Sequence, residues 1–211
     1  MKAWLTRLVP DPRSRSVASE IRDAVRLHKR VMTLVPDGLG DKARQQTGVL
    51  YRVDNDAILV QTGLPPDTST LPAGYQDRRV SDLTALLDAL RPGLFVRYRL
   101  AGNAVRRLGR NTTAGRPGQA LSLKGHEAAT WWAERAERCG LGLHTLDSVP
   151  ETTMTGKRDE ETRVLHAVTR YDGLAVITDP EALRNAITTG VGRGKSYGCG
   201  LLSIAPARRP T

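Results

Sequence analysis

The chain has 211 residues, and 32 Lys and Arg against 22 Asp and Glu give it a formal net charge of +10. This length fits one large domain or two of about 100 residues each, and the charge is typical of nucleic-acid binders. The sequence has no apolar run of about 18 residues, no apolar signal-peptide region and no cysteine pattern for disulfides or zinc. These absences argue against membrane, secreted and zinc-site proteins, so we expect a cytoplasmic protein with no membrane partner, metal or cofactor.

The first half of the chain predicts a strand, a long helix and then a hairpin. Ala3–Val9 reads as the strand. A helix capped by Ser14 or Ser16 is expected to run to about Val35, because apolar residues recur at helical spacing from Val17 onwards. The remaining expected elements are the hairpin strands Gly48–Val53 and Ala57–Thr62, the loop Leu64–Gly74, a short edge strand Arg79–Leu83 and a helical turn Thr84–Leu90.

The second half repeats this order of elements. Its expected elements are the strand Leu94–Leu100, the helix His126–Cys139 closed by Gly140, the hairpin strands Leu143–Thr153 and Arg163–Ile177 joined by the charged stretch Gly156–Thr162, the helix Asp179–Thr189 and the strand Leu201–Ala205. The order predicts an α+β protein with two tandem ferredoxin-like (RRM-like) βαββαβ domains, residues 1–92 and 93–211, which meet near Pro92.

A glycine-rich loop near the C-terminus is the most informative local feature. Five glycines lie between Gly190 and Gly200, with basic residues among them, and such a backbone can cradle phosphate. The loop is not a P-loop, because Thr189 stands where that motif requires glycine and the expected helix precedes the loop. The alternative is an ordinary glycine-rich turn. The candidate RNA-binding residues here are Gly192, Arg193, Gly194, Lys195, Ser196 and Tyr197.

A second basic feature is the segment from Arg91 to Lys124, which contains no acidic residue. Arginines outnumber lysines 26 to 6 in the whole chain, which suits bidentate phosphate binding but also follows from a GC-rich genome. The segment predicts a polyanion contact, and its alternative is a solvated loop. The candidate RNA-binding residues are Arg97 and Arg99 on the strand and Arg106, Arg107, Arg110 and Arg116 in the loop.

Four histidines are present, and none belongs to a metal-binding motif. His28 lies on the apolar stripe of the first helix, where spacing alone predicts a core or edge-of-core side chain. His126 is expected to be exposed at a helix start, whereas His144 and His166 fall in strand-like runs that suggest structural roles.

Several segments together resemble one known family. They are Leu27-His28 followed by Leu34–Asp37, the strand Phe95–Asn103, the segment Leu121–Lys124 with Trp131-Trp132 and Gly140-Leu141, and the loop and strand Gly190–Pro206. With these segments the whole chain is similar to the CasE-type CRISPR-associated endoribonucleases of type I-E Cascade systems, which serve antiviral defence. The C-terminal segment is the most specific part of the resemblance.

The resemblance implies a metal-independent endoribonuclease that cuts CRISPR precursor RNA at the base of the repeat hairpin. The 2′-OH 5′ to the cut would attack, a 2′,3′-cyclic phosphate would form, and the enzyme would stay bound to its product and join other Cascade subunits. His28 matches the catalytic histidine, as general base or general acid. Lys195 matches a loop position near the scissile phosphate, where it would act as a second catalytic residue or only bind the backbone.

The chain departs from the family pattern at two positions. Val25 stands where some members have a tyrosine one turn before the histidine, and Ala104 replaces the usual proline after Asn103. The first departure leaves the second proton-transfer or orienting group unassigned. The alternative function is a non-catalytic RNA-binding subunit of a CRISPR ribonucleoprotein, with His28 structural.

Overall fold

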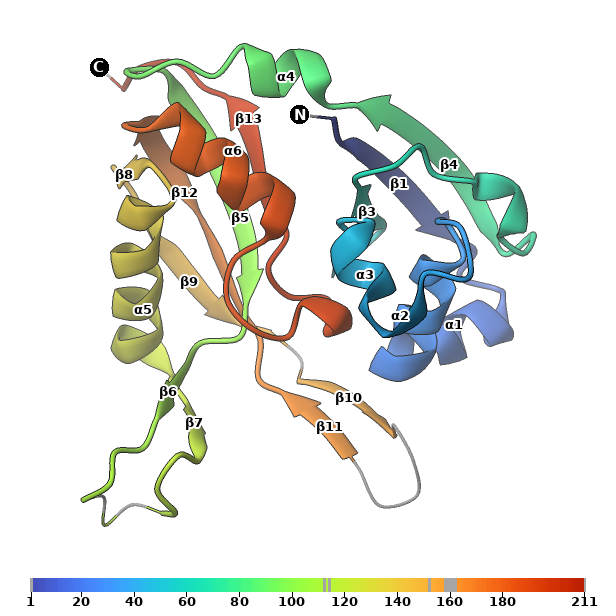
Figure 1. Ribbon diagram of the computed structural model, residues 1–211, viewed down its shortest axis with the longest axis horizontal. Helices are drawn as coiled ribbons and strands as arrows, with labels where there is room; N and C mark the ends of the chain where they lie inside the picture. The colour runs from blue at the N-terminus through green and yellow to red at the C-terminus, as the bar shows by residue number, and fades with distance from the viewer. Residues whose placement is uncertain (1, 112, 114, 152, 158–162, 211) are drawn as a thin grey trace.

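The computed structural model describes residues 2–111, 113, 115–151, 153–157 and 163–210, and Figure 1 shows its elements. The first half contains β1 (Trp4–Pro10), α1 (Arg15–Arg22), α2 (Ala24–Met32), η1 (Gly40–Lys42), α3 (Ala43–Gln46), β2 (Leu50–Val53), β3 (Ile58–Thr62), η2 (Thr68–Thr70), β4 (Tyr75–Asp82) and α4 (Thr84–Asp88), where η denotes a 3₁₀ helix. The second half contains β5 (Phe95–Gly102), β6 (Val105–Arg107), β7 (Ala120–Ser122), α5 (Gly125–Arg138), β8 (Leu141–Leu143), β9 (Asp147–Pro150), β10 (Met154–Lys157), β11 (Arg163–His166), β12 (Thr169–Ile177), α6 (Pro180–Thr189), η3 (Lys195–Tyr197) and β13 (Leu202–Pro206).

The first sheet has the antiparallel strand order β2-β3-β1-β4, with the first and third strands at its centre. This is the order of a ferredoxin-like sheet. One face of the sheet buries Leu8, Tyr51 and Val60 in a common core with Leu27 and Val31 of α2. Burial of these apolar side chains holds α2 against the sheet. It also fixes the rotation of α2 about its axis, and so determines which of its residues face away from the core.

The second sheet repeats the order as β13-β5-β12-β8, and β9 continues along β12. Helices α5 and α6 contribute Trp132, Leu183 and Ile187 to a core with Leu100 and Tyr171 of the sheet. The predicted α+β class with two tandem ferredoxin-like units is therefore confirmed, whereas the division into domains at residue 92 stays a prediction. No helix in the part of the chain described here combines the length and the apolar character needed to cross a membrane.

The first long helix differs from the prediction. The cap at Ser14 is confirmed, since its Oγ accepts from the Val17 N–H, but the helix stops at Arg22 and a second helix starts at Ala24. Asp23 between them is extended, and its carboxylate accepts from the Val25 and Arg26 N–H groups at 2.9 and 3.0 Å. An aspartate that caps backbone N–H groups competes with helix continuation, and the spacing of apolar residues does not reveal this.

Three strand predictions also needed revision. β4 begins at Tyr75 rather than Arg79, and the loop after β5 contains the short hairpin β6–β7. The predicted strand Leu143–Thr153 is divided into β8 and β9, which both pair with β12. The predicted strand Arg163–Ile177 is divided into β12 and β11, and β11 pairs with β10 instead. Part of the predicted charged connection, residues 158–162, lies outside the described residues. The β2–β3 hairpin and the helix capped by Asp179 are confirmed.

Side chains of the first sheet donate hydrogen bonds to backbone and side-chain atoms of the second half. Arg52 Nη1 donates to the Leu201 carbonyl at 3.3 Å and to Ser203 Oγ at 3.0 Å. Tyr51 Oη donates to the Ser196 carbonyl at 3.0 Å, and all of these donors lie on β2. The glycine-rich loop is consequently held against β2 and α2 rather than free in solvent.

Candidate active site

His28 lies on the flank of α2 that faces the glycine-rich loop. Its neighbour Leu27 points into the core, and the His28 ring meets the Tyr197 ring edge-on with centroids 6.1 Å apart. His28 is half-buried, and its Nδ1 has no hydrogen-bond partner among the described residues. Burial lowers the pKa of His28, and the nearby positive charge of Arg44 lowers it further, so the neutral imidazole is favoured near pH 7.

The loop presents Lys195, Ser196 and Tyr197 on the turn η3. Gly194 and Gly198 flank this turn with φ of 74° and 80°, a left-handed conformation that glycine adopts without strain. The ends of the loop are fixed by backbone bonds, because Val191 N donates to Gly200 O at 2.9 Å and Gly200 N donates to Ala101 O at 2.7 Å. The turn therefore has a defined shape next to α2.

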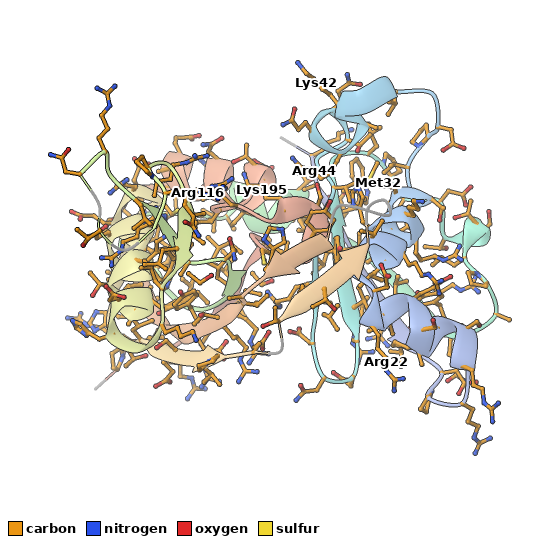
Figure 2. All side chains as sticks on the ribbon, turned by 90° about the horizontal axis from the view of Figure 1, so that it is seen from below. Arg22, Met32, Lys42, Arg44, Arg116 and Lys195 are labelled. Carbon is orange, nitrogen blue, oxygen red and sulfur yellow. The ribbon has the colours of Figure 1, made fainter. Side chains whose placement is uncertain are left out.

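Basic side chains from two elements meet at this turn. Lys195 Nζ donates to the Thr189 carbonyl at 2.8 Å, and Arg44 of α3 donates from Nη1 to the Val49 carbonyl at 3.2 Å. Burial, and then the charge of Arg44, lower the pKa of Lys195. Figure 2 labels both side chains at the border between the two halves. Within the described residues neither cation has a carboxylate within 4.0 Å, so bound phosphate would relieve their repulsion.

A second imidazole also contacts the Tyr197 ring. His166 at the end of β11 stacks on Tyr197 with centroids 5.2 Å apart and an interplanar angle of 27°. Burial lowers the pKa of His166, and the exposed Arg193 lowers it further. Arg193 is itself positioned by a β-bridge to Asn103, whose Nδ2 donates to the Ala167 carbonyl at 2.8 Å.

We call the side chains of His28, Arg44, His166, Arg193, Lys195 and Tyr197 the His28 cluster. It combines groups that transfer protons near neutral pH with cations suited to a phosphodiester. No group of three or more His, Cys, Asp or Glu side chains that could hold a metal ion occurs in the described part of the chain. The arrangement can bind a phosphate and move protons at its oxygens.

The predicted strand arginines lie away from the His28 cluster. Arg97 and Arg99 project from β5 into an open groove of about 970 Å³, which no residue of the cluster lines. Arg99 is already paired, since its Nε lies 2.5 Å from Asp172 Oδ1, whereas Arg97 is exposed. RNA contact by these two arginines stays a prediction.

The predicted loop arginines lie on the β6–β7 arm, the hairpin and loop from Val105 to Ser122. Figure 1 shows this arm projecting from the same end of the second sheet as the β10–β11 hairpin. Arg106 pairs with Glu127 at 3.3 Å, Arg107 donates to the Gly118 carbonyl at 3.1 Å, and Arg110 and Arg116 are exposed. The arm thus presents exposed arginines that do not belong to the His28 cluster.

Sequence reasoning missed Arg44 and gave His166 only a structural role. Arg44 sits on a short helix without a motif, and His166 follows a stretch whose pairing was not predicted. No spacing rule links either residue to His28. Both join the cluster only through tertiary packing.

Alanine at Gly198 is expected to destabilise the fold by about 1–2 kcal/mol, because a side chain in the left-handed region is strained. The added Cβ would also lie 3.2 Å from Met154 Cε and 3.4 Å from the Tyr51 ring. Urea unfolding of the Gly198→Ala variant measures this loss. Gly109→Ala is the matched control, because its Cβ would meet open space, and equal stabilities of the two variants would contradict the prediction.

Comparison with known proteins identifies relatives over nearly the full length. The family model described as CRISPR associated protein matches residues 3–206. The chain is 29% identical over 221 residues to the CRISPR-associated endoribonuclease Cse3 of Thermus thermophilus, covering 96% of this chain and 100% of that protein.

Two solved structures extend the likeness to the fold. Thermus thermophilus Cse3 bound to an RNA representing a pre-cleavage complex matches with a TM-score of 0.80 at 27% identity, covering 98% of this chain and 100% of that one. A chain of a pre-nicking CRISPR RNA-guided surveillance complex matches with a TM-score of 0.74 at 37% identity, covering 97% and 100%. On this evidence the chain belongs to the family of CRISPR-associated proteins.

Proposed function

We propose that this protein is an endoribonuclease that processes CRISPR precursor RNA. The observation that carries the proposal is the half-buried His28, held against the glycine-rich loop and near the cations Arg44 and Lys195. The similarity to Cse3, whose name and pre-cleavage RNA complex describe such an activity, supports it over the full chain. A non-catalytic RNA-binding subunit would need the cations but not an imidazole kept neutral near them.

The reaction is a transesterification within the RNA. An imidazole of the cluster, His28, takes the proton from the 2′-OH 5′ to the cut, and O2′ attacks phosphorus while the bond to O5′ breaks. Lys195 and Arg44 stabilise the negative charge that builds up on the phosphoryl oxygens. The products are a 2′,3′-cyclic phosphate and a 5′-OH, and these steps use only side chains of the chain.

The substrate is a repeat RNA hairpin cut at the base of its stem, and the protein stays bound to the product. A-form RNA is recognised mainly through its phosphates and shape, which suits the exposed arginines of the β6–β7 arm. Because a similar chain occurs in a CRISPR RNA-guided surveillance complex, we infer that the product complex joins other subunits of that assembly. The site of action is the cytoplasm, and the chain works as two domains divided near Pro92.

The test of this function is incubation of the protein with a repeat RNA hairpin in EDTA. A discrete shorter RNA with a 2′,3′-cyclic phosphate end is expected, and an RNA with a scrambled stem should stay intact. Binding without any cut would favour the non-catalytic subunit. Strict dependence on Mg²⁺ would overturn the metal-independent mechanism.

Removal of two cations from the β6–β7 arm is expected to weaken RNA binding. The double variant Arg110→Ala/Arg116→Ala should lower the slope of log affinity against log salt by about 2, because each lost phosphate contact removes roughly 0.9 from it. Filter binding over a range of salt concentrations measures the slope. Arg13→Ala/Arg15→Ala is the matched control, because it removes the same charge from two exposed side chains before and at the start of α1. An equal effect there would contradict a specific contact by the arm.

A further inference from the structure

The β10–β11 hairpin carries His166 across from the second half to α2. β10 packs closely on the start of α2, since a Cβ at Gly156 would lie 3.0 Å from both Asp23 Oδ1 and Val25 N. His166 pairs with Met154 in the hairpin register, and Met154 packs beside Gly198 of the loop. The hairpin thus contacts α2 of the first half and the glycine-rich loop of the second half, and these contacts fix the position of His166.

The phenol ring of Tyr197 contacts two imidazoles. His28 meets it edge-on at 6.1 Å between centroids, and His166 stacks on it at 5.2 Å. Each imidazole has its own guanidinium neighbour, Arg44 for His28 and Arg193 for His166. Two proton-transfer groups therefore belong to one cationic cluster around the Tyr197 ring.

Cleavage of a phosphodiester by its own 2′-OH needs proton transfer at two oxygens. A base must take the proton from O2′, and an acid must give one to O5′ as the bond from phosphorus to O5′ breaks. A single imidazole can assist only one of these transfers at a time. The neutral His28 suits the base, which leaves the acid unassigned.

We propose that His166 is the general acid of the reaction, an assignment that rests on the proposed endoribonuclease function. His28 accepts the 2′-OH proton, the bond from O2′ to phosphorus forms, the bond to O5′ breaks, and protonated His166 gives its proton to O5′. His28 ends protonated and His166 neutral, and exchange with water restores both. Tyr197 contacts both rings.

The charges around the two imidazoles favour these roles once RNA is bound. His28 faces Arg44 of α3 and Tyr197 of the loop, and His166 faces Tyr197 and Arg193. In free protein burial, and then the charge of Arg193, disfavour a protonated His166. A phosphodiester bound beside His166 offsets the charge of Arg193 and so favours the protonated imidazole.

A 5′-thio substrate distinguishes the loss of the general acid from the loss of the general base. Sulfur in place of O5′ at the cut leaves without protonation, so a variant that lacks only the acid should cut this RNA at the wild-type rate. We expect His166→Phe, which keeps the ring stacked on Tyr197, to cut the ordinary RNA roughly 10²–10⁴-fold more slowly and the thio RNA normally. His28→Ala should be slow on both substrates.

The matched control is His144→Phe, because exposed His144 also packs on an aromatic ring, Phe95, at 5.0 Å but lies outside the His28 cluster. It should cut both RNAs like the wild type. In single-turnover experiments with saturating RNA, the wild-type rate should rise and then fall with pH, and His166→Phe should lose the falling limb.

Two results would overturn the assignment while the proposed function stands. One is a wild-type rate of His166→Phe on ordinary RNA, and the other is an equal slowing of both RNAs, which would make His166 a positioning residue. Wild-type protein that cuts neither RNA would overturn the proposed function and the assignment with it.

Discussion

Replacement of His28 by alanine is expected to slow cleavage of a repeat RNA hairpin by roughly 10²–10⁴-fold. The reason is that the imidazole borders the loop and the cations Arg44 and Lys195, where it can take a proton from the 2′-OH. The cations and the β6–β7 arm remain in the variant, so RNA affinity should be nearly unchanged. Single-turnover cleavage and filter binding on the same RNA separate the two effects.

The control for His28→Ala is a variant of another histidine of the chain. His126→Ala alters an exposed histidine at the start of α5 and should leave the cleavage rate unchanged. Circular dichroism and urea unfolding should show that His28→Ala is folded. Cleavage by His28→Ala at the wild-type rate would remove His28 from the mechanism.

Replacement of Arg52 by alanine is expected to reduce the free energy of unfolding by about 3 kcal/mol, as for other buried charged pairs that lose one partner. The Arg52 side chain is only 4% exposed, and its Nε lies 2.9 Å from Asp54 Oδ1. Its Nη1 donates to the Arg99 and Leu201 carbonyls at 3.3 Å and to Ser203 Oγ at 3.0 Å. The variant leaves the Asp54 carboxylate of the first half and two carbonyl groups of the second half without this donor.

Urea unfolding of Arg52→Ala measures the loss, and Arg79→Ala is its control. Arg79 also contacts an aspartate, at 3.8 Å, but its side chain is 73% exposed. An exposed pair contributes about 0–1 kcal/mol, so this variant should unfold close to the wild type. Similar stabilities of the two variants would contradict the role of Arg52 in joining the halves.

The sequence predicts most of the fold because local signals agree with the tertiary structure. Alternation in the strands, the turn after Val53 and the caps at Ser14 and Asp179 each specify an element without reference to the rest of the chain. The break at Asp23 was missed because apolar spacing continues through it. The β10–β11 hairpin was missed because its stability depends on packing against α2.

The candidate site is less predictable than the fold, because its residues come together only through long-range packing. Apolar spacing alone assigned His28 to the core or its edge, and only the family resemblance pointed to catalysis. Arg44 and His166 carry no local signal, because α3 and β11 reach the cluster through long-range contacts with the loop. Arg97 and Arg99, adjacent in sequence to the basic loop, instead face a separate groove on the second sheet.

The most direct test of the mechanism is a repeat RNA with one 2′-deoxy nucleotide, placed 5′ to the cut. The deoxy RNA keeps every phosphate for Lys195, Arg44 and the β6–β7 arm but lacks the attacking hydroxyl. The account predicts that it binds like the unmodified RNA and stays uncut in single-turnover assays. Cleavage of the deoxy RNA at an undiminished rate would show that the attacking group comes from elsewhere and would contradict the proposed chemistry.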